Sequence, residues 1–151
     1  MSKIAALIDF TEVTQKVIDF SARQAQAHEA ELYLLHVEPN NAPTLYRKID
    51  EAERNRIAGV LRHEHFDLQG KAAQLRERFH IKIHPVLIEG AEVDKAVVAE
   101  VEKLQVNHVV LGNHRHSGIY NYLFGSVGQA LIKSLNCPLT LIPDDDASQS
   151  A

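Results

Sequence analysis

The chain alternates short apolar runs with longer segments in which apolar residues recur every three to four positions. A short continuous apolar run is typical of a parallel strand buried on both faces, whereas the longer recurrence is typical of an amphipathic helix. The apolar runs predict five strands, at Ile4–Ile8, Glu31–Val37, Ile81–Ile88, His108–Leu111 and Pro138–Ile142. The other segments predict a helix started by Asp9 or Thr11, one helix or two (interrupted near Gly70) between Tyr46 and Phe79, and helices at Val93–Leu104 and Val127–Leu135.

Strands that alternate with helices of ten or more residues indicate βαβ units and a parallel sheet. We therefore expect an α/β fold of the Rossmann or flavodoxin type: a single-domain, doubly wound, five-stranded parallel sheet of order 3-2-1-4-5, with helices on both faces. Pro85 places the third strand at an edge or a bulge, because proline cannot donate to the sheet. Ligands of such sheets bind beyond the carboxyl ends of the strands, where the strand order reverses. Asp9 and Gly112, which end strands one and four, lie at that point.

Length and composition limit the class of protein. The 151 residues fit one domain, 1–143, followed by a polar, acidic tail, 144–151, that we expect to be disordered. A net charge of −4 argues against nucleic-acid binding. The apolar runs are too short for membrane insertion, and the first residues do not resemble a signal peptide. The single cysteine, Cys137, suits a reducing, cytoplasmic location, and its place beside a strand favours a packed thiol over a reactive one.

The segment after strand four has the chemistry of a phosphate-binding loop. A glycine directly after a strand lets the backbone approach a ligand closely or adopt positive φ. A glycine and a serine then open a helix, whose free N–H groups and positive dipole end favour an anion. The residues that we predict to contact phosphate are Gly112, Asn113, His114, Arg115, Gly125, Ser126 and Val127.

This segment resembles the ATP-binding loop of the universal stress protein family. That loop has a glycine, two residues, a second glycine, nine residues, a third glycine, and a serine or threonine. Gly112, Gly125 and Ser126 match it, and Arg115 occupies the position of the second glycine. Further matches in the same order extend the resemblance over residues 4–143.

Two of these further matches concern the nucleotide. Asp9-Phe10-Thr11 resembles the family's first loop, in which an aspartate lies beside the nucleotide. Val37 resembles the residue whose backbone contacts the adenine edge. The Asp9 carboxylate has three possible roles: it holds a ribose hydroxyl, holds a phosphate-bound Mg²⁺, or caps the following helix.

Arg115 leaves two alternatives open. Its side chain either crowds the phosphates, or its guanidinium binds them in a bidentate fashion. The neighbouring histidines make the segment cationic, which favours the second alternative. Family members without the full glycine pattern include some that do not bind ATP.

The resemblance implies a nucleotide-dependent regulator that binds ATP or AMP, with or without Mg²⁺, and acts through a protein partner such as a transporter or a regulator. It also implies a homodimer formed through the edge strand Leu139–Ile142. Two alternatives remain: a dimeric interaction protein that binds no nucleotide, and a weak ATP hydrolase with Asp9 as its base.

Catalytic and metal sites have little support in the sequence. It contains no nucleophile elbow and no Walker A lysine motif, so we predict no catalytic residues and at most slow ATP hydrolysis. His63 and His65 lie two apart on a predicted helix, and His114 and His116 lie two apart in a loop. Neither pair is accompanied by a cysteine or carboxylate at zinc-ligand spacing, so we predict no metal site.

Overall fold

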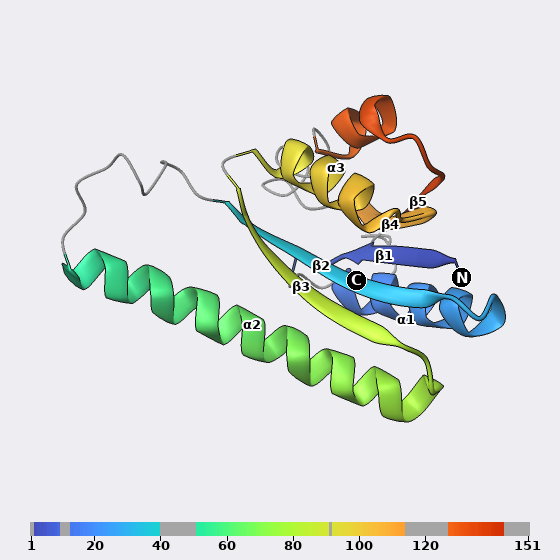
Figure 1. The fold of residues 1–151 in the computed structure, drawn as a ribbon, viewed down its shortest axis with the longest axis horizontal. Helices are drawn as coiled ribbons and strands as arrows, with labels where there is room; N and C mark the ends of the chain where they lie inside the picture. The colour runs from blue at the N-terminus through green and yellow to red at the C-terminus, as the bar shows by residue number, and fades with distance from the viewer. Residues whose placement is uncertain (1, 10–12, 40–50, 91, 114–126, 144–151) are drawn as a thin grey trace, which may run out of the picture.

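The computed structural model describes residues 2–9, 13–39, 51–90, 92–113 and 127–143 (Figure 1). The strands of this part are β1 (Lys3–Leu7), β2 (Glu31–Pro39), β3 (Ile83–Gly90), β4 (His108–Asn113) and β5 (Leu139–Pro143). The helices are α1 (Thr14–Ala27), α2 (Glu51–Phe79) and α3 (Val93–Leu104), with a further helical stretch at 127–134. All strand pairs are parallel, and the order is β3-β2-β1-β4-β5. The predicted fold class and strand order are therefore confirmed.

Helices cover both faces of the sheet (Figure 1). One core contains α1, the second half of α2 and the strand side chains that face them, among them Leu32 and Leu34. The other core contains α3, Leu131 of the 127–134 stretch and the alternate strand residues, among them Tyr33 and Leu35. This alternation along β2 follows from the two-residue period of a strand. It also explains why the strands are almost continuously apolar.

Among the differences between the predicted and the observed elements, three concern a helix or the candidate site. The segment predicted as one helix or two is a single helix, α2, and an interruption at Gly70 is wrong. β4 continues through Gly112 to Asn113 instead of breaking at the glycine. α1 begins at Thr14 with Val13 as its N-cap and no side-chain cap bond, and Thr11 lies outside the described residues.

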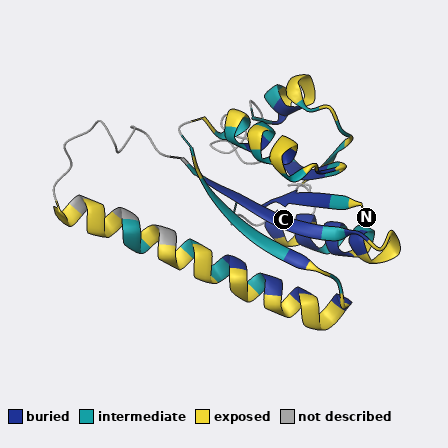
Figure 2. Cartoon of the chain, in the orientation of Figure 1, coloured by how far each residue is buried: buried dark blue, intermediate teal, exposed yellow. Residues whose placement is uncertain are grey.

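The two halves of α2 differ in burial (Figure 2). Leu68, Ala72, Leu75 and Phe79 recur at helical spacing and are buried against the sheet and α1. Val60 of the first half, by contrast, leaves 38% of its surface exposed. The apolar stripe of the second half therefore fixes the helix on the sheet.

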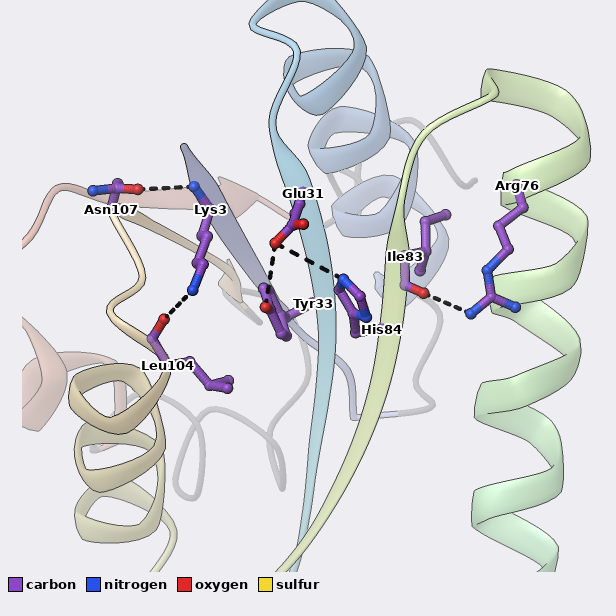
Figure 3. A network of polar contacts seen from close by, with 8 residues as sticks. All are labelled: Lys3, Glu31, Tyr33, Arg76, Ile83, His84, Leu104 and Asn107. Atoms are coloured by element: carbon purple, nitrogen blue, oxygen red, sulfur yellow. Dashed lines mark hydrogen bonds and ion pairs between the residues drawn. The ribbon is translucent and has the colours of Figure 1, made fainter. Parts of the chain in front are cut away.

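Polar contacts connect the elements at the amino ends of the strands (Figure 3). The Lys3 backbone N–H donates to Asn107 Oδ1 at 2.8 Å, and the Lys3 Nζ donates to the Leu104 carbonyl at 2.9 Å. Tyr33 Oη donates to Glu31 Oε2 at 3.4 Å, and His84 Nε2 lies 3.9 Å from the same oxygen. The Lys3 bonds join β1 to the α3–β4 turn, and the Glu31 contacts join β2 to β3, at the end of the sheet opposite the expected ligand site.

The sheet edges bear on two predictions. β3 is an edge strand, as Pro85 predicted, and β5 is the other edge strand.

No helix among the described residues is long and apolar enough to cross a membrane.

Candidate functional site

The strand order reverses at β1, which pairs with β2 on one side and β4 on the other. The Ile8 N–H donates to the Leu35 carbonyl at 2.7 Å just beyond the end of β1. Asp9 follows directly, and β4 ends next to it with Gly112 and Asn113. The sheet therefore brings these predicted residues together at the carboxyl ends of the strands, where open parallel sheets bind their ligands.

The backbone N–H and C=O of Val37 point into the space beyond the carboxyl end of β1. Peptide groups along a strand alternate in direction, and the Leu35 carbonyl points to β1. Val37, two residues further, therefore directs its N–H and C=O to the same side, beyond the last β1–β2 pair, Leu7 with Leu35. The Val37 side chain is buried in the core on the α3 face, so the backbone is the part suited to a ligand.

The Asp9 carboxylate lies at the start of α1. Its Oδ1 accepts a hydrogen bond of 2.6 Å from the hydroxyl of Thr14, a buried residue of the first helical turn. A negative charge is stabilised at a helix N-terminus by the dipole. This contact joins Asp9 to the first turn of α1 without capping it, because α1 has no side-chain cap bond. The ribose and Mg²⁺ roles of Asp9 stay predictions.

Gly112 is in tight contact with the same turn of α1. A Cβ at Gly112 would lie 2.5 Å from Val13 Cγ1, closer than side chains tolerate. None of the described glycines has positive φ. Packing of α1 onto β4 therefore accounts for this glycine, and its role as a phosphate contact stays a prediction.

The remaining predicted contacts lie mostly outside the described residues. These are Phe10, Thr11, His114, Arg115, Gly125 and Ser126. Val127 is half-buried against the α3-side core and is the first described residue of the helical stretch 127–134. The start of this helix borders on residues outside the described part, so the predicted helix start at Val127 stays a prediction.

A polar cluster that the sequence analysis missed lies on the other face of β2. His36 is buried, and its Nδ1 lies 2.6 Å from the Ile8 carbonyl oxygen. Its Nε2 lies 3.6 Å from Glu38 Oε2 and 3.4 Å from Glu64 Oε2 of α2. Burial, and then the contact with Glu38, raise the pKa of Glu64 to about 7. We call His36, Glu38 and Glu64 the β2–α2 cluster.

The signal for this cluster was present but incomplete. A histidine and a carboxylate two apart on a strand share one face. The third member is distant in the chain, so only the packing of α2 reveals it. The two histidines that the sequence shows two apart on this helix make contacts within α2 instead. His63 Nε2 lies 3.4 Å from Asp67, and His65 lies 2.9 Å from Gln69.

Comparison with known proteins identifies the class. The sheet order and the helices on both faces define a flavodoxin-like α/β protein. A profile of the universal stress protein family matches residues 1–143, and the chain belongs to this family. A universal stress protein of Methanocaldococcus jannaschii is 24% identical over 140 residues, which cover 93% of this chain and 81% of the relative.

Solved structures share the fold. The universal stress protein UspA of Lactobacillus plantarum superposes with a TM-score of 0.75 at 15% identity, covering 93% of this chain and 97% of the other. A universal stress protein of Archaeoglobus fulgidus in complex with dAMP superposes with a TM-score of 0.64 at 17% identity, covering 94% and 98%. At these identities the likeness concerns the fold.

Proposed function

We propose that this protein binds an adenine nucleotide, ATP or AMP, at the carboxyl edge of β1, β2 and β4, and acts as a nucleotide-dependent regulator. The observation that carries the proposal is the direction of the Val37 backbone, whose N–H and C=O point to this edge beyond the last pair with β1. A donor and an acceptor on one residue match the edge of adenine. The dAMP complex of the Archaeoglobus relative supports this ligand class.

The phosphates would lie between the end of β4 and the helical stretch whose described part is 127–134. Gly112 and Asn113 supply one side. If the helix starts at Val127 as predicted from the sequence, its N-terminus supplies the positive dipole end on the other side. His114, Arg115, Gly125 and Ser126 belong to the segment that joins the two. Asp9 would face the ribose or a phosphate-bound Mg²⁺, which neutralises phosphate charge when bound.

Regulation would operate through protein contacts. In the proposal, nucleotide binding biases the segment between β4 and residue 127, and this change is recognised by a protein partner such as a transporter or a regulator in the cytoplasm. The chain itself would form a homodimer through β5, an edge strand on which Leu141 leaves 39% of its surface exposed. No efficient catalysis is part of this function.

The second candidate is a dimeric interaction protein that binds no nucleotide. The packing at Gly112 favours it, because Val13 fills the place that a side chain would take and thus explains the glycine without a ligand. The carboxylate contact between Asp9 and Thr14 explains Asp9 in the same way. A weak ATP hydrolase is the third candidate, and it differs from the first in releasing phosphate.

Nucleotide content and rebinding separate these candidates. The purified protein is denatured, and its supernatant is analysed by ion exchange with mass detection. Stripped protein is then titrated with Mg-ATP and AMP in a calorimeter, with Mg-GTP as the control. The proposal expects bound adenine nucleotide or saturable rebinding with adenine preference; an empty protein that gives no heat with millimolar ATP contradicts it.

Arg115→Ala resolves the two readings of that residue. Weaker binding means that the guanidinium holds phosphate, whereas tighter binding means that it obstructs the site. Asp9→Asn tests the hydrolase: a variant that binds ATP normally but no longer releases phosphate would support that candidate.

A further inference from the structure

The β2–α2 cluster shares no residue with the proposed nucleotide contacts and lies on the opposite face of β2 from the Val37 side chain. His36 and Glu38 project from β2 towards α2, whereas the neighbouring Val37 side chain belongs to the core on the α3 face. Glu64 reaches the same point from the middle of α2. One potential ligand atom from each of the three residues lies within 4.8 Å of the others.

The hydrogen bond at Nδ1 determines how the His36 ring presents its other nitrogen. A carbonyl oxygen only accepts, so the 2.6 Å contact with Ile8 places the ring proton on Nδ1. In the neutral ring, the lone pair then lies on Nε2, which faces the two carboxylates. Histidines that bind metals are held in this way, with the second nitrogen donating to a carbonyl or carboxylate.

The distances at Nε2 fit a shared cation. Two ligands that lie about 2.1 Å from one Zn²⁺ at a tetrahedral angle are about 3.4 Å from each other. His36 Nε2 lies 3.4 Å from Glu64 Oε2 and 3.6 Å from Glu38 Oε2. Both separations match neighbouring ligands of one metal.

The negative charges of Glu38 and Glu64 also favour a bound cation. The Glu38 and Glu64 carboxylates meet beside the His36 imidazole, whose side chain is only 9% exposed. The Glu38 and Glu64 carboxylates repel each other when both are ionised. A divalent cation between the carboxylates offsets that repulsion.

We propose that the β2–α2 cluster is a binding site for a divalent transition-metal ion, Zn²⁺ foremost, with His36 Nε2, Glu38 and Glu64 as its protein ligands. Imidazole selects Zn²⁺ and its neighbours over Mg²⁺ and Ca²⁺, which prefer oxygen ligands alone. Three protein ligands leave a fourth position for water.

The site would fasten α2 to the sheet. Glu64 lies one turn before Leu68, where the buried stripe of α2 in the described part begins. A metal shared with β2 therefore extends the attachment of the helix towards its first half. Through the Ile8 carbonyl, the same site contacts the end of β1, directly before Asp9.

The test uses full-length protein stripped with EDTA, exchanged into metal-free buffer, and kept free of nucleotide. ZnCl₂ is titrated by calorimetry, and thermal unfolding is followed with and without ZnCl₂. We expect a saturable component of one Zn²⁺ per chain and a raised unfolding midpoint. Glu64→Gln, which keeps the shape of the side chain, should weaken this component at least about tenfold and abolish the shift in midpoint.

His63→Gln is the matched control, since it removes an exposed imidazole from the same helix one residue from Glu64. It should bind Zn²⁺ as the wild type does. His36→Asn should lose the component as well, and Glu64→Gln still decides the matter if that buried substitution impairs folding. Absence of a saturable component, or equal affinity in Glu64→Gln and the wild type, would overturn the proposal. Because no nucleotide is present, neither result bears on the nucleotide site.

Discussion

Two consecutive residues at the start of α1 contact two of the residues that the sequence assigns to the ligand. Val13 occupies the space above Gly112, and the Thr14 hydroxyl donates to Asp9. A glycine and an aspartate suit a nucleotide site, and here the same two residues also allow α1 to begin close to the sheet. At the scale of single residues, sequence alone could not separate these roles, because small size and negative charge serve both.

Gly112→Ala should destabilise the fold. Its methyl group would lie 2.5 Å from Val13 Cγ1, and overpacking of this kind costs about 1–3 kcal/mol. Urea unfolding measures the loss. Adding Val13→Ala should recover part of it, since that substitution removes the clashing methyl groups. A Gly112→Ala protein as stable as the wild type would contradict the packing explanation.

His108 predicts a pH dependence of stability. Burial, and then the nearby His28, lower the pKa of His108 below its ordinary value of 6.5, and its Nε2 lies 2.7 Å from the Thr140 hydroxyl. The unfolded chain therefore binds the proton first, so the contribution to stability is lost as the pH falls below about 6.5 through the lowered pKa. Urea midpoints over this range should fall less steeply for His108→Gln. Parallel curves for the two proteins would refute the prediction.

Elements were predicted best where hydrophobic periodicity was strong. The helix Val93–Leu104 agrees at both ends with α3, and each strand start or end lies within two residues of its prediction. Of the two alternatives, one helix or two, the one with an interruption near Gly70 was wrong, because one glycine costs a helix only about 1 kcal/mol relative to alanine. The four buried side chains from Leu68 to Phe79 outweigh that cost.

Gly70→Ala should therefore stabilise α2. Apart from its chain neighbours and the nearby backbone of α2, nothing lies within 4 Å of the position that its Cβ would take. Alanine is favoured over glycine in a helix interior by about 0.5–1 kcal/mol. The expected result is a higher urea midpoint than that of the wild type, opposite in sign to Gly112→Ala. A lower midpoint would mean that α2 needs the glycine.

At the scale of the whole molecule, the alternation of strands and helices predicted the sheet order, and the order fixed which strand ends meet. That is why Asp9, Val37 and Gly112 were brought to one edge without any knowledge of side-chain contacts. The β2–α2 cluster escaped prediction for the opposite reason. It depends on how a long helix crosses the sheet, and nothing in the spacing of His36 and Glu64 encodes that crossing.

The proposed dimer can be tested at the exposed edge. Leu141→Lys places a charge on β5, and a charged edge strand resists pairing with another chain. Sedimentation velocity should show a dimer for the wild type and a monomer for the variant. Phe66→Lys is the control, because it changes an equally apolar, exposed residue on α2 and should leave the dimer intact. A monomeric wild type, or a dimeric Leu141→Lys protein, would contradict the proposed interface.

The central claim is that an adenine base binds at the Val37 backbone, and amide NMR of the isotopically labelled, stripped protein tests it most directly. Titration with ATP should shift the Val37 and Asn113 amide resonances in a saturable manner, together with that of Asp9, whereas GTP should leave Val37 unchanged. Resonances at the amino ends of the strands, such as Lys3 and Glu31, serve as the internal control. If ATP at millimolar concentration leaves the Val37 amide in place, the proposed adenine site is wrong.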